Sequence, residues 1–162
     1  MLKFRLITSE DFPLMLIWLS NEHVKQWWND GDDTLEKVSL HYGKESDHVV
    51  RFILMEVNED GWQEEKRIGY FQYYFNDDDE TIGIDQFIGE ESYIGRGIGE
   101  KAIKQFVALI DERHNPTQII LNTSPQNRMA IRCYEKVGFK YWKTVKTEDG
   151  KLAYMMKLDR GK

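Results

Sequence analysis

The sequence has 162 residues, 41% hydrophobic and 31% charged, which fits one globular domain over residues 1–162 and excludes a disordered or low-complexity chain. With 22 Lys and Arg against 28 Asp and Glu, the net charge of −6 disfavours nucleic acid as a partner and favours a cationic substrate. A single cysteine and the lack of a long apolar run predict a cytoplasmic chain with no disulfide, export signal or membrane span.

The first half of the chain predicts one strand, two helices and three further strands. Alternating apolar residues indicate a strand over 2–6, after which Ser9 can cap a helix over 12–19. Thr34 can cap a second helix, and Gly43 can end it. Three β-rich runs then predict a meander over 49–57, 67–75 and 81–88. Turn residues separate these runs at 58–61 and 76–80.

The second half alternates helices with strands. A glycine-bearing loop at 93–99 opens a helix that closes near Pro116, and a short buried strand follows over 118–121. A helix over 126–137 ends at Gly138. The last two β-rich runs, 139–145 and 152–158, flank a hairpin turn at 147–150. This order predicts an α/β fold, with a mixed sheet that carries helices on its faces.

The glycine loop is the first feature that indicates chemistry. Gly95, Gly97 and Gly99 lie between a strand and a helix, where backbone N–H groups and the helix dipole can hold a phosphate. The Rossmann pattern fails because Glu100 stands at its third glycine, and the P-loop pattern fails because no glycine precedes Lys101. A helix-entry turn with positive φ angles is the alternative interpretation.

The second feature is the helix pattern Asn-x-x-Ala-x-x-x-Tyr-x-x-x-Gly-Phe from Asn127 to Phe139. Ile131 and Tyr134 lie three residues apart, so they share a helical face. Taken alone, an aromatic residue at this spacing belongs to the core more often than to a site.

Together the two motifs resemble the GCN5-related N-acetyltransferase (GNAT) superfamily. Its phosphate loop, Q/R-x-x-G-x-G/A, is matched from Ile94 to Gly99 without the leading Gln or Arg. Further segments resemble the aminoglycoside 6′-N-acetyltransferase branch in order along nearly the whole chain. They are Asp11-Phe-Pro-Leu, Trp18-Leu, Trp27-Trp28, Ile68-Gly-Tyr, Gly83 to Gly89, Arg96 to Gly99 and Ala130 to Lys136.

The resemblance implies the GNAT fold, with a mostly antiparallel central sheet, splayed middle strands (81–88 and 118–121) and helices on both faces. It implies acetyl-CoA as co-substrate and no metal. The pyrophosphate would meet the amides of the glycine loop, and the pantetheine arm would pair with the strand at 86–88, with Asn127 on the other side. The implied cofactor-binding residues are Gln86, Phe87, Ile88, Gly95, Arg96, Gly97, Ile98, Gly99 and Asn127.

For catalysis, the resemblance implies direct acetyl transfer in a ternary complex. Asp85 would accept a proton from the amine, directly or through water, although a solvent-facing strand acid is the alternative. The backbone N–H of Phe87 or Ile88 would polarise the thioester carbonyl. Tyr134 would protonate the leaving thiolate or donate a hydrogen bond to it. Cys133 lies about 100° around the helix from Tyr134 and is interpreted as a packing residue.

The expected acceptor is a small cationic amine, most simply the 6′-amine of an aminoglycoside. Acids cluster at 30–33, 77–80 and 90–91, although such runs are often only solvated turns. Trp28 has a core role as its equal alternative, and the four histidines are too scattered for a metal site. The substrate-binding residues implied by the resemblance are Trp28, Gln72, Asp85, Glu90 and Asn122, the last standing where the branch often has an acid.

Two rival functions remain open at this stage. One is an acyl-CoA N-acyltransferase for another small amine, such as a hydroxylysine siderophore precursor. The other is an acyl-CoA-binding module without catalysis, against which the presence of Asp85 and Tyr134 argues. The chain is expected to act as a monomer or a homodimer.

Overall fold

One sheet with strand order β1-β2-β3-β4-β5-β7-β6 organises the fold. The structure is a computed structural model that describes residues 1–58, 65–78 and 80–161. The chain forms two units, Met1–Gln72 with Gln86–Arg96, and Tyr73–Asp85 with Gly97–Lys162. Strands β3 (Lys66–Phe75) and β4 (Thr81–Ile88) contribute residues to both units. Within the described ranges, no helix is long and apolar enough to cross a membrane.

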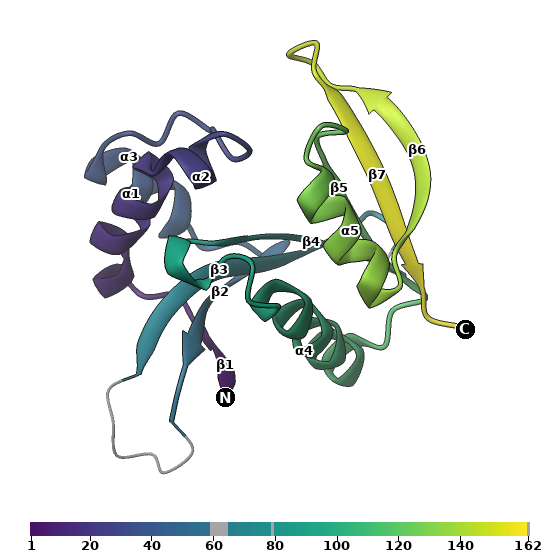
Figure 1. The fold of residues 1–162 in the computed structure, drawn as a ribbon, viewed down its shortest axis with the longest axis horizontal. Coiled ribbons are helices and arrows are strands. Elements are labelled where there is room, and N and C mark those ends of the chain that lie inside the picture. Colours follow the sequence, from purple (N-terminus) through teal and green to yellow (C-terminus); the bar gives the residue numbers. More distant parts are fainter. Residues whose placement is uncertain (59–64, 79, 162) are drawn as a thin grey trace. The chain divides into compact units, whose positions relative to one another are not determined.

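The first unit carries the N-terminal strands and three helices (Figure 1). Strand β1 (Leu2–Leu6) pairs antiparallel with β2 (Val49–Glu56), and α1 (Phe12–Ser20) packs beside α3 (Leu35–Tyr42). These elements were predicted, whereas the four-residue helix α2 (Glu22–Lys25) was not. The core between α1, α3 and the strands includes Met15, Trp18, Val38, Ile53 and Tyr70.

The start of α1 differs from the prediction. A 3-10 turn, Ser9–Asp11, precedes the helix, and its capping residue is Thr8 rather than Ser9. The Thr8 amide donates to Asp11 Oδ2 at 2.8 Å in a capping box. Asp11 is the acidic partner of Thr8 in this capping box. Its fully buried carboxylate also accepts hydrogen bonds from Arg5 and Arg67. The ion pairs that hold the Asp11 carboxylate therefore favour the capping box with Thr8 over a cap at Ser9.

The second unit contains the helices and strands that follow the glycine loop. Helix α4 (Ile98–His114) leads to β5 (Gln118–Thr123), and α5 (Arg128–Val137) leads to the hairpin of β6 (Lys140–Lys146) and β7 (Leu152–Asp159). All were predicted, with shifted bounds. Strand β5 runs two residues further than expected, and α5 starts two residues later because Asn127 caps it.

The pairing of β4 with β5 is short. The two strands run parallel, and their register joins only Thr81 to Gln118, Ile82 to Ile119 and Gly83 to Ile120. Along the rest of its length, β5 pairs antiparallel with β7, through Thr123. Among the described residues, Ile84 and Asp85 have no partner in β5, which confirms the predicted splay of the middle strands.

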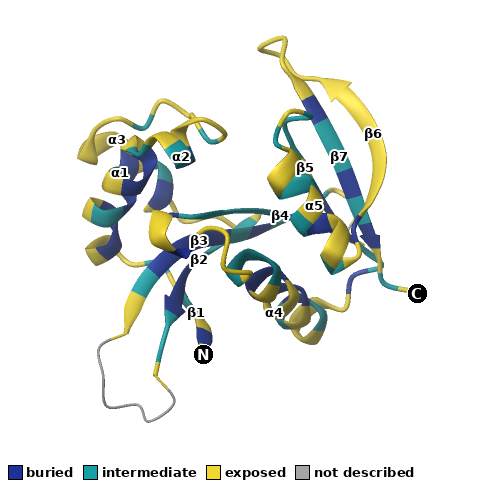
Figure 2. Ribbon diagram, viewed as in Figure 1, coloured by how far each residue is buried: buried dark blue, intermediate teal, exposed yellow. Residues whose placement is uncertain are grey.

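Strand β6 is the outermost strand of the sheet. It pairs with β7, and all seven of its residues are exposed (Figure 2). Its side chains include Lys140, Lys143 and Lys146 together with exposed aromatic residues. The amines of Lys143 and Lys157 lie 4.1 and 5.3 Å from the centre of the Trp142 ring.

Two predicted turns are only partly described. Most of the turn at 58–61 lies outside the described residues, as does Asp79 in the turn at 76–80. In the part of the second turn that is described, Asp78 accepts hydrogen bonds from the amides of Glu80 and Thr81. This acid therefore serves the turn itself.

Candidate active site

The glycine loop has the backbone geometry that a phosphate cradle requires. Gly95 and Gly97 have φ angles of +79° and +76°, and a Cβ at either would meet nothing within 4 Å. Gly97 is the N-cap of α4, and the first helical bond runs from the Lys101 amide to the Gly97 carbonyl at 3.2 Å. The amides of Ile98 and Gly99 therefore lack helical acceptors, and the space around the loop is open. These residues fit a pyrophosphate.

Gly99 has a different role in the same loop. A Cβ at this position would lie 3.5 Å from Cys133 Sγ, which is ordinary contact with α5. Burial, together with the charge of Glu100, raises the pKa of the Cys133 thiol. The thiol is therefore a poor nucleophile, in agreement with its interpretation as a packing residue.

Arg96 is held by contacts that the sequence did not reveal. Its guanidinium carbon lies 4.7 Å from the centre of the Tyr93 ring, and the Lys66 amine lies 5.1 Å from the same ring. The Tyr93 hydroxyl donates to Glu56 at 3.0 Å. Burial and this bond to Glu56 raise the pKa of Tyr93, so the phenol stays neutral. The Tyr93 ring thus holds the guanidinium of Arg96, the residue that directly precedes Gly97.

Asp85 follows the paired part of β4 and is half-buried. Its neighbour in the second unit is Tyr74, whose ring lies over Gly83. A Cβ at Gly83 would lie 2.0 Å from that ring. Burial and the charge of Asp85 raise the pKa of Tyr74 to about 12. Asp85 therefore has a neutral phenol nearby, and a glycine inside a strand was the signal that could have indicated the close approach.

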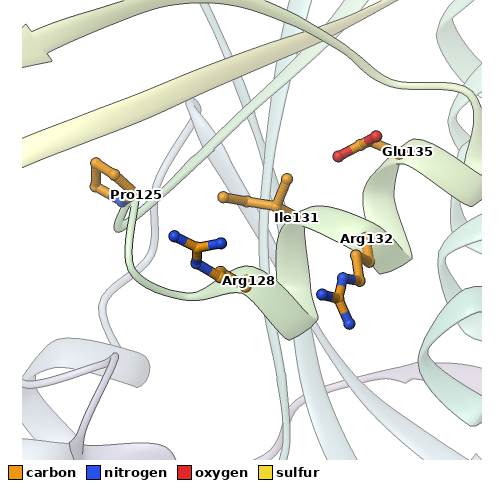
Figure 3. A pocket seen from close by; sticks show the side chains of 5 residues that line it. All are labelled: Pro125, Arg128, Ile131, Arg132 and Glu135. Carbon is orange, nitrogen blue, oxygen red and sulfur yellow. The ribbon is translucent and has the colours of Figure 1, made fainter.

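Helix α5 holds two predicted residues firmly. Tyr134 is buried and packs edge-on against Phe139 at 6.3 Å between ring centres. Asn127 Oδ1 accepts a hydrogen bond from the Ala130 amide at 3.3 Å, so this side chain caps the helix. Ile131 does not share the buried position of Tyr134 but lines a cavity at the surface (Figure 3), because the faces of the two residues diverge by about 60°.

An aromatic cluster of the first unit holds Trp28. Its ring lies edge-on to Phe87 and Tyr70, with centres 5.2 and 5.9 Å away, and its indole N–H donates to the Tyr42 hydroxyl at 3.3 Å. Trp28 remains half-buried, whereas Trp27 is exposed. The core interpretation of Trp28 is therefore correct for much of its ring, and one part of the ring stays accessible.

Three further contacts in the first unit involve predicted site residues. The Tyr70 hydroxyl donates to Gln72 Oε1 at 2.5 Å. The Trp18 indole N–H donates to Glu90 Oε1 at 3.0 Å. His23 Nε2 lies 3.2 Å from the carbonyl of Ile88. Trp18 and His23 were missed as partners because more than sixty residues separate each from its contact.

The acidic segment at 30–33 is more structured than a solvated turn. Asp33 pairs with Lys37 at 2.8 Å, and Asp32 Oδ2 lies 2.6 Å from His41 Nδ1. The donor atoms of Asp30, Asp32 and His41 lie within 4.8 Å of one another. Only one of the four histidines, His41, takes part in this group.

The predicted site residues fall into two sets, one in each unit. The first unit contains Trp28, Gln72, Gln86, Phe87, Ile88, Glu90, Gly95 and Arg96. The second unit contains Asp85, Gly97, Ile98, Gly99, Asn122, Asn127 and Tyr134. Asn122 is exposed on β5, opposite Met155 of β7.

Comparison with known proteins agrees with these features. The acetyltransferase (GNAT) domain family matches residues 8–147. An aminoglycoside N(6′)-acetyltransferase type 1 from Klebsiella pneumoniae is 33% identical, over 94% of this chain and 80% of that protein. A kanamycin resistance protein from Rhizobium radiobacter is 43% identical over 46% of this chain and 68% of its own length. The solved structure of AAC(6′)-Ib with paromomycin and acetyl-CoA has a TM-score of 0.83 and 34% identity, covering 98% of this chain and 93% of that chain.

The chain belongs to the GNAT acetyltransferase family. Within that family, the similarity over nearly the full chain confirms the predicted aminoglycoside 6′-N-acetyltransferase branch. The splayed strands β4 and β5 and the glycine loop are the two structural features of this chain that the family resemblance predicted.

Proposed function

We propose that this protein transfers the acetyl group of acetyl-CoA to the 6′-amine of an aminoglycoside, by direct transfer in a ternary complex. The observation that carries the proposal is the open glycine loop, where two left-handed glycines expose the amides that begin α4. The similarity to an aminoglycoside N(6′)-acetyltransferase along 94% of the chain supports the choice of acceptor.

The cofactor, when bound, supplies an activated acetyl thioester. Gly97, Ile98 and Gly99 hold its pyrophosphate through backbone amides, and Arg96 adds a positive charge. The backbone N–H of Phe87 or Ile88 polarises the thioester carbonyl.

Proton transfer is assigned to the second unit. Asp85 accepts a proton from the reacting amine, directly or through water, and the neutral Tyr74 phenol beside it is available as a hydrogen-bond donor. Tyr134 donates to the leaving thiolate. A phenol near pKa ~10 facing a thiol near ~8.5 makes complete transfer uphill by about 2 kcal/mol, so hydrogen bonding is its main contribution.

The acceptor is recognised by acids and by an aromatic face. Glu90 keeps one carboxylate oxygen beyond its bond to Trp18, and Gln72 and Asn122 add polar groups. Trp28 offers the accessible part of its ring to an aminosugar. The chain's net charge of −6 favours a polycation over a neutral acceptor. We further propose a cytoplasmic monomer or homodimer that needs no metal.

The test is a thiol-release assay with acetyl-CoA against kanamycin-type aminoglycosides and a panel of small mono- and diamines. We expect turnover of the aminoglycosides, with a KM that rises with salt while the KM of acetyl-CoA moves less. Asp85→Asn should reduce kcat more than it raises the acceptor KM. Asp111→Asn is the matched control, because this carboxylate pairs with Arg160 elsewhere in the second unit.

Three results would contradict the proposal in different ways. Turnover of a neutral or singly charged amine without any aminoglycoside acetylation would favour the rival acyltransferase. CoA binding without turnover of any amine would favour the non-catalytic module. Unchanged kcat in a folded Asp85→Asn variant would remove that residue from the mechanism.

A further inference from the structure

One polar group in the core of the first unit contacts a predicted acceptor-binding residue. Trp18, on α1, is 1% exposed and packs in the hydrophobic core of that unit. Its indole N–H donates to Glu90 Oε1 at 3.0 Å. An indole nitrogen can only donate, so the carboxylate oxygen is necessarily the acceptor. Because the donor is neutral, the bond fixes one oxygen of Glu90 and leaves its negative charge in place.

Gly89, the residue before Glu90, lets the indole approach so closely. A Cβ at this position would lie 2.1 Å from Cδ2 and 2.4 Å from Cε2 of Trp18. The amides of Gly89 and Glu90 both donate to the Ile68 carbonyl, at 2.8 and 3.2 Å. A glycine in such a segment marks a close approach of another group to the backbone. Glu90 is therefore held through both its backbone and its side chain.

The Glu90 carboxylate has no cationic partner among the described residues. No basic side chain there lies within 4.0 Å of it, whereas Asp11, Asp33 and Asp111 each form an ion pair. Glu90 is half-buried, so the carboxylate is partly shielded from water. A charge that is partly desolvated and already oriented attracts an ammonium more strongly than a freely moving surface carboxylate does.

Phe87 connects this carboxylate to the aromatic face assigned to the acceptor. The ring of Trp18 lies edge-on to Phe87 at 6.1 Å between centres, and the ring of Trp28 lies edge-on to it at 5.2 Å. The same packed rings thus hold both Trp28 and the partner of Glu90. An aminosugar presents an apolar ring face together with ammonium groups, so it is complementary to an indole and a carboxylate.

We propose that Trp18 is a positioning residue for acceptor specificity, which holds the Glu90 carboxylate for an ammonium group of the aminoglycoside that is not acetylated. This inference rests on the proposed function. The reacting amine must be neutral to attack the thioester, whereas a lasting ion pair requires a charged amine. Glu90 therefore suits a second amine, and the pair favours acceptors that carry at least two amines.

The test combines calorimetric Kd values for kanamycin with kcat and KM from the thiol-release assay. Glu90→Gln keeps an oxygen for the Trp18 N–H and removes the charge, so the Kd should rise about 5–20-fold with kcat unchanged within about twofold. Trp18→Phe keeps an aromatic ring and removes the N–H, so the Kd should rise about 3–5-fold. The double variant should bind kanamycin no more weakly than Glu90→Gln, because Trp18 acts only through this charge.

Matched controls separate this role from general effects. Glu91→Gln removes the charge of the neighbouring exposed acid, and Trp142→Phe makes the same indole change on the exposed strand β6. Both should keep the wild-type Kd. Gly89→Ala displaces the indole without removing it and should raise the Kd as Trp18→Phe does, which gives a second route if Trp18→Phe does not fold.

Wild-type kanamycin affinity in folded Glu90→Gln or Trp18→Phe would overturn this inference and leave the proposed function standing. Additive losses in the double variant would overturn it as well, because Trp18 would then act independently of the Glu90 charge. A large fall in kcat in Glu90→Gln would do the same, since Glu90 would then serve the reacting amine. No kanamycin acetylation by the wild type would overturn the proposed function and this inference with it.

Discussion

Replacing Asp11 with asparagine should destabilise the first unit in a way that depends on pH. Burial raises the pKa of this carboxyl, but hydrogen bonds from Arg5, the Thr8 amide and Arg67 outweigh that effect and lower it from 3.8 to about 2. The difference corresponds to about 2.4 kcal/mol of stability at neutral pH. Asp11→Asn removes this contribution and leaves the two guanidinium groups without their shared carboxylate.

The sign of the pH dependence follows from the lowered pKa. The contribution of Asp11 is complete well above pH 3.8 and is lost as the pH falls through about 2. The difference in unfolding free energy between wild type and Asp11→Asn should therefore shrink, to roughly half its neutral value near pH 3.

Urea titrations followed by circular dichroism at pH 7, 5, 4 and 3 measure this difference. With a slope of about 1–3 kcal/mol per molar urea, the variant's midpoint should fall by roughly 1–2 M at pH 7. Asp33→Asn is the control, because Asp33 forms a solvent-exposed pair with Lys37 and should leave the midpoint near wild type. A difference between wild type and Asp11→Asn that stays constant from pH 7 to pH 3 would refute the reasoning.

Three further outcomes are expected. Gly83→Ala should lower the melting temperature by several degrees because its Cβ would lie 2.0 Å from a tyrosine ring. Gly99→Ala should change it little, because its Cβ would lie 3.5 Å from Cys133 Sγ, an ordinary contact, and equal melting temperatures for the two variants would contradict this. Tyr93→Leu should raise the KM of acetyl-CoA about 2–10-fold by releasing Arg96, and Tyr93→Phe, which keeps the ring, should not. Tyr134→Phe should lower kcat by up to about 10²-fold at unchanged CoA affinity, and wild-type turnover in a folded variant would return Tyr134 to the core.

Features set by neighbouring residues were predictable from the sequence. Thr34 caps α3, and Gly138, with φ +120°, ends α5, because a cap or a left-handed turn depends on a few adjacent residues. Ser9 was the wrong cap because the deciding partners, Arg5 and Arg67, act through tertiary contacts. The four-residue helix α2 was missed because it is too short to show a periodic pattern.

In the candidate site, too, features set by adjacent residues could be predicted, and contacts between distant residues could not. The glycine loop could be predicted, since positive φ angles belong to glycine, and so could the strand that carries Asp85. The contacts that orient the site could not be predicted, because they join residues far apart in the chain. Trp18 and Glu90 are separated by 72 positions, and Tyr93 and Glu56 by 37. The periodic pattern of residues within one helix or strand cannot predict contacts between such distant positions.

The exposed strand β6 has a consequence for how copies of this protein behave at high concentration. An outer strand with open backbone groups and exposed Tyr141, Trp142 and Val145 is a template for adding another strand, the first step of aggregation. Lys140, Lys143 and Lys146 recur along it, so a second β6 aligned antiparallel about Lys143 would set lysine against lysine along its length. Repulsion between copies then keeps the open edge of the sheet in contact with water.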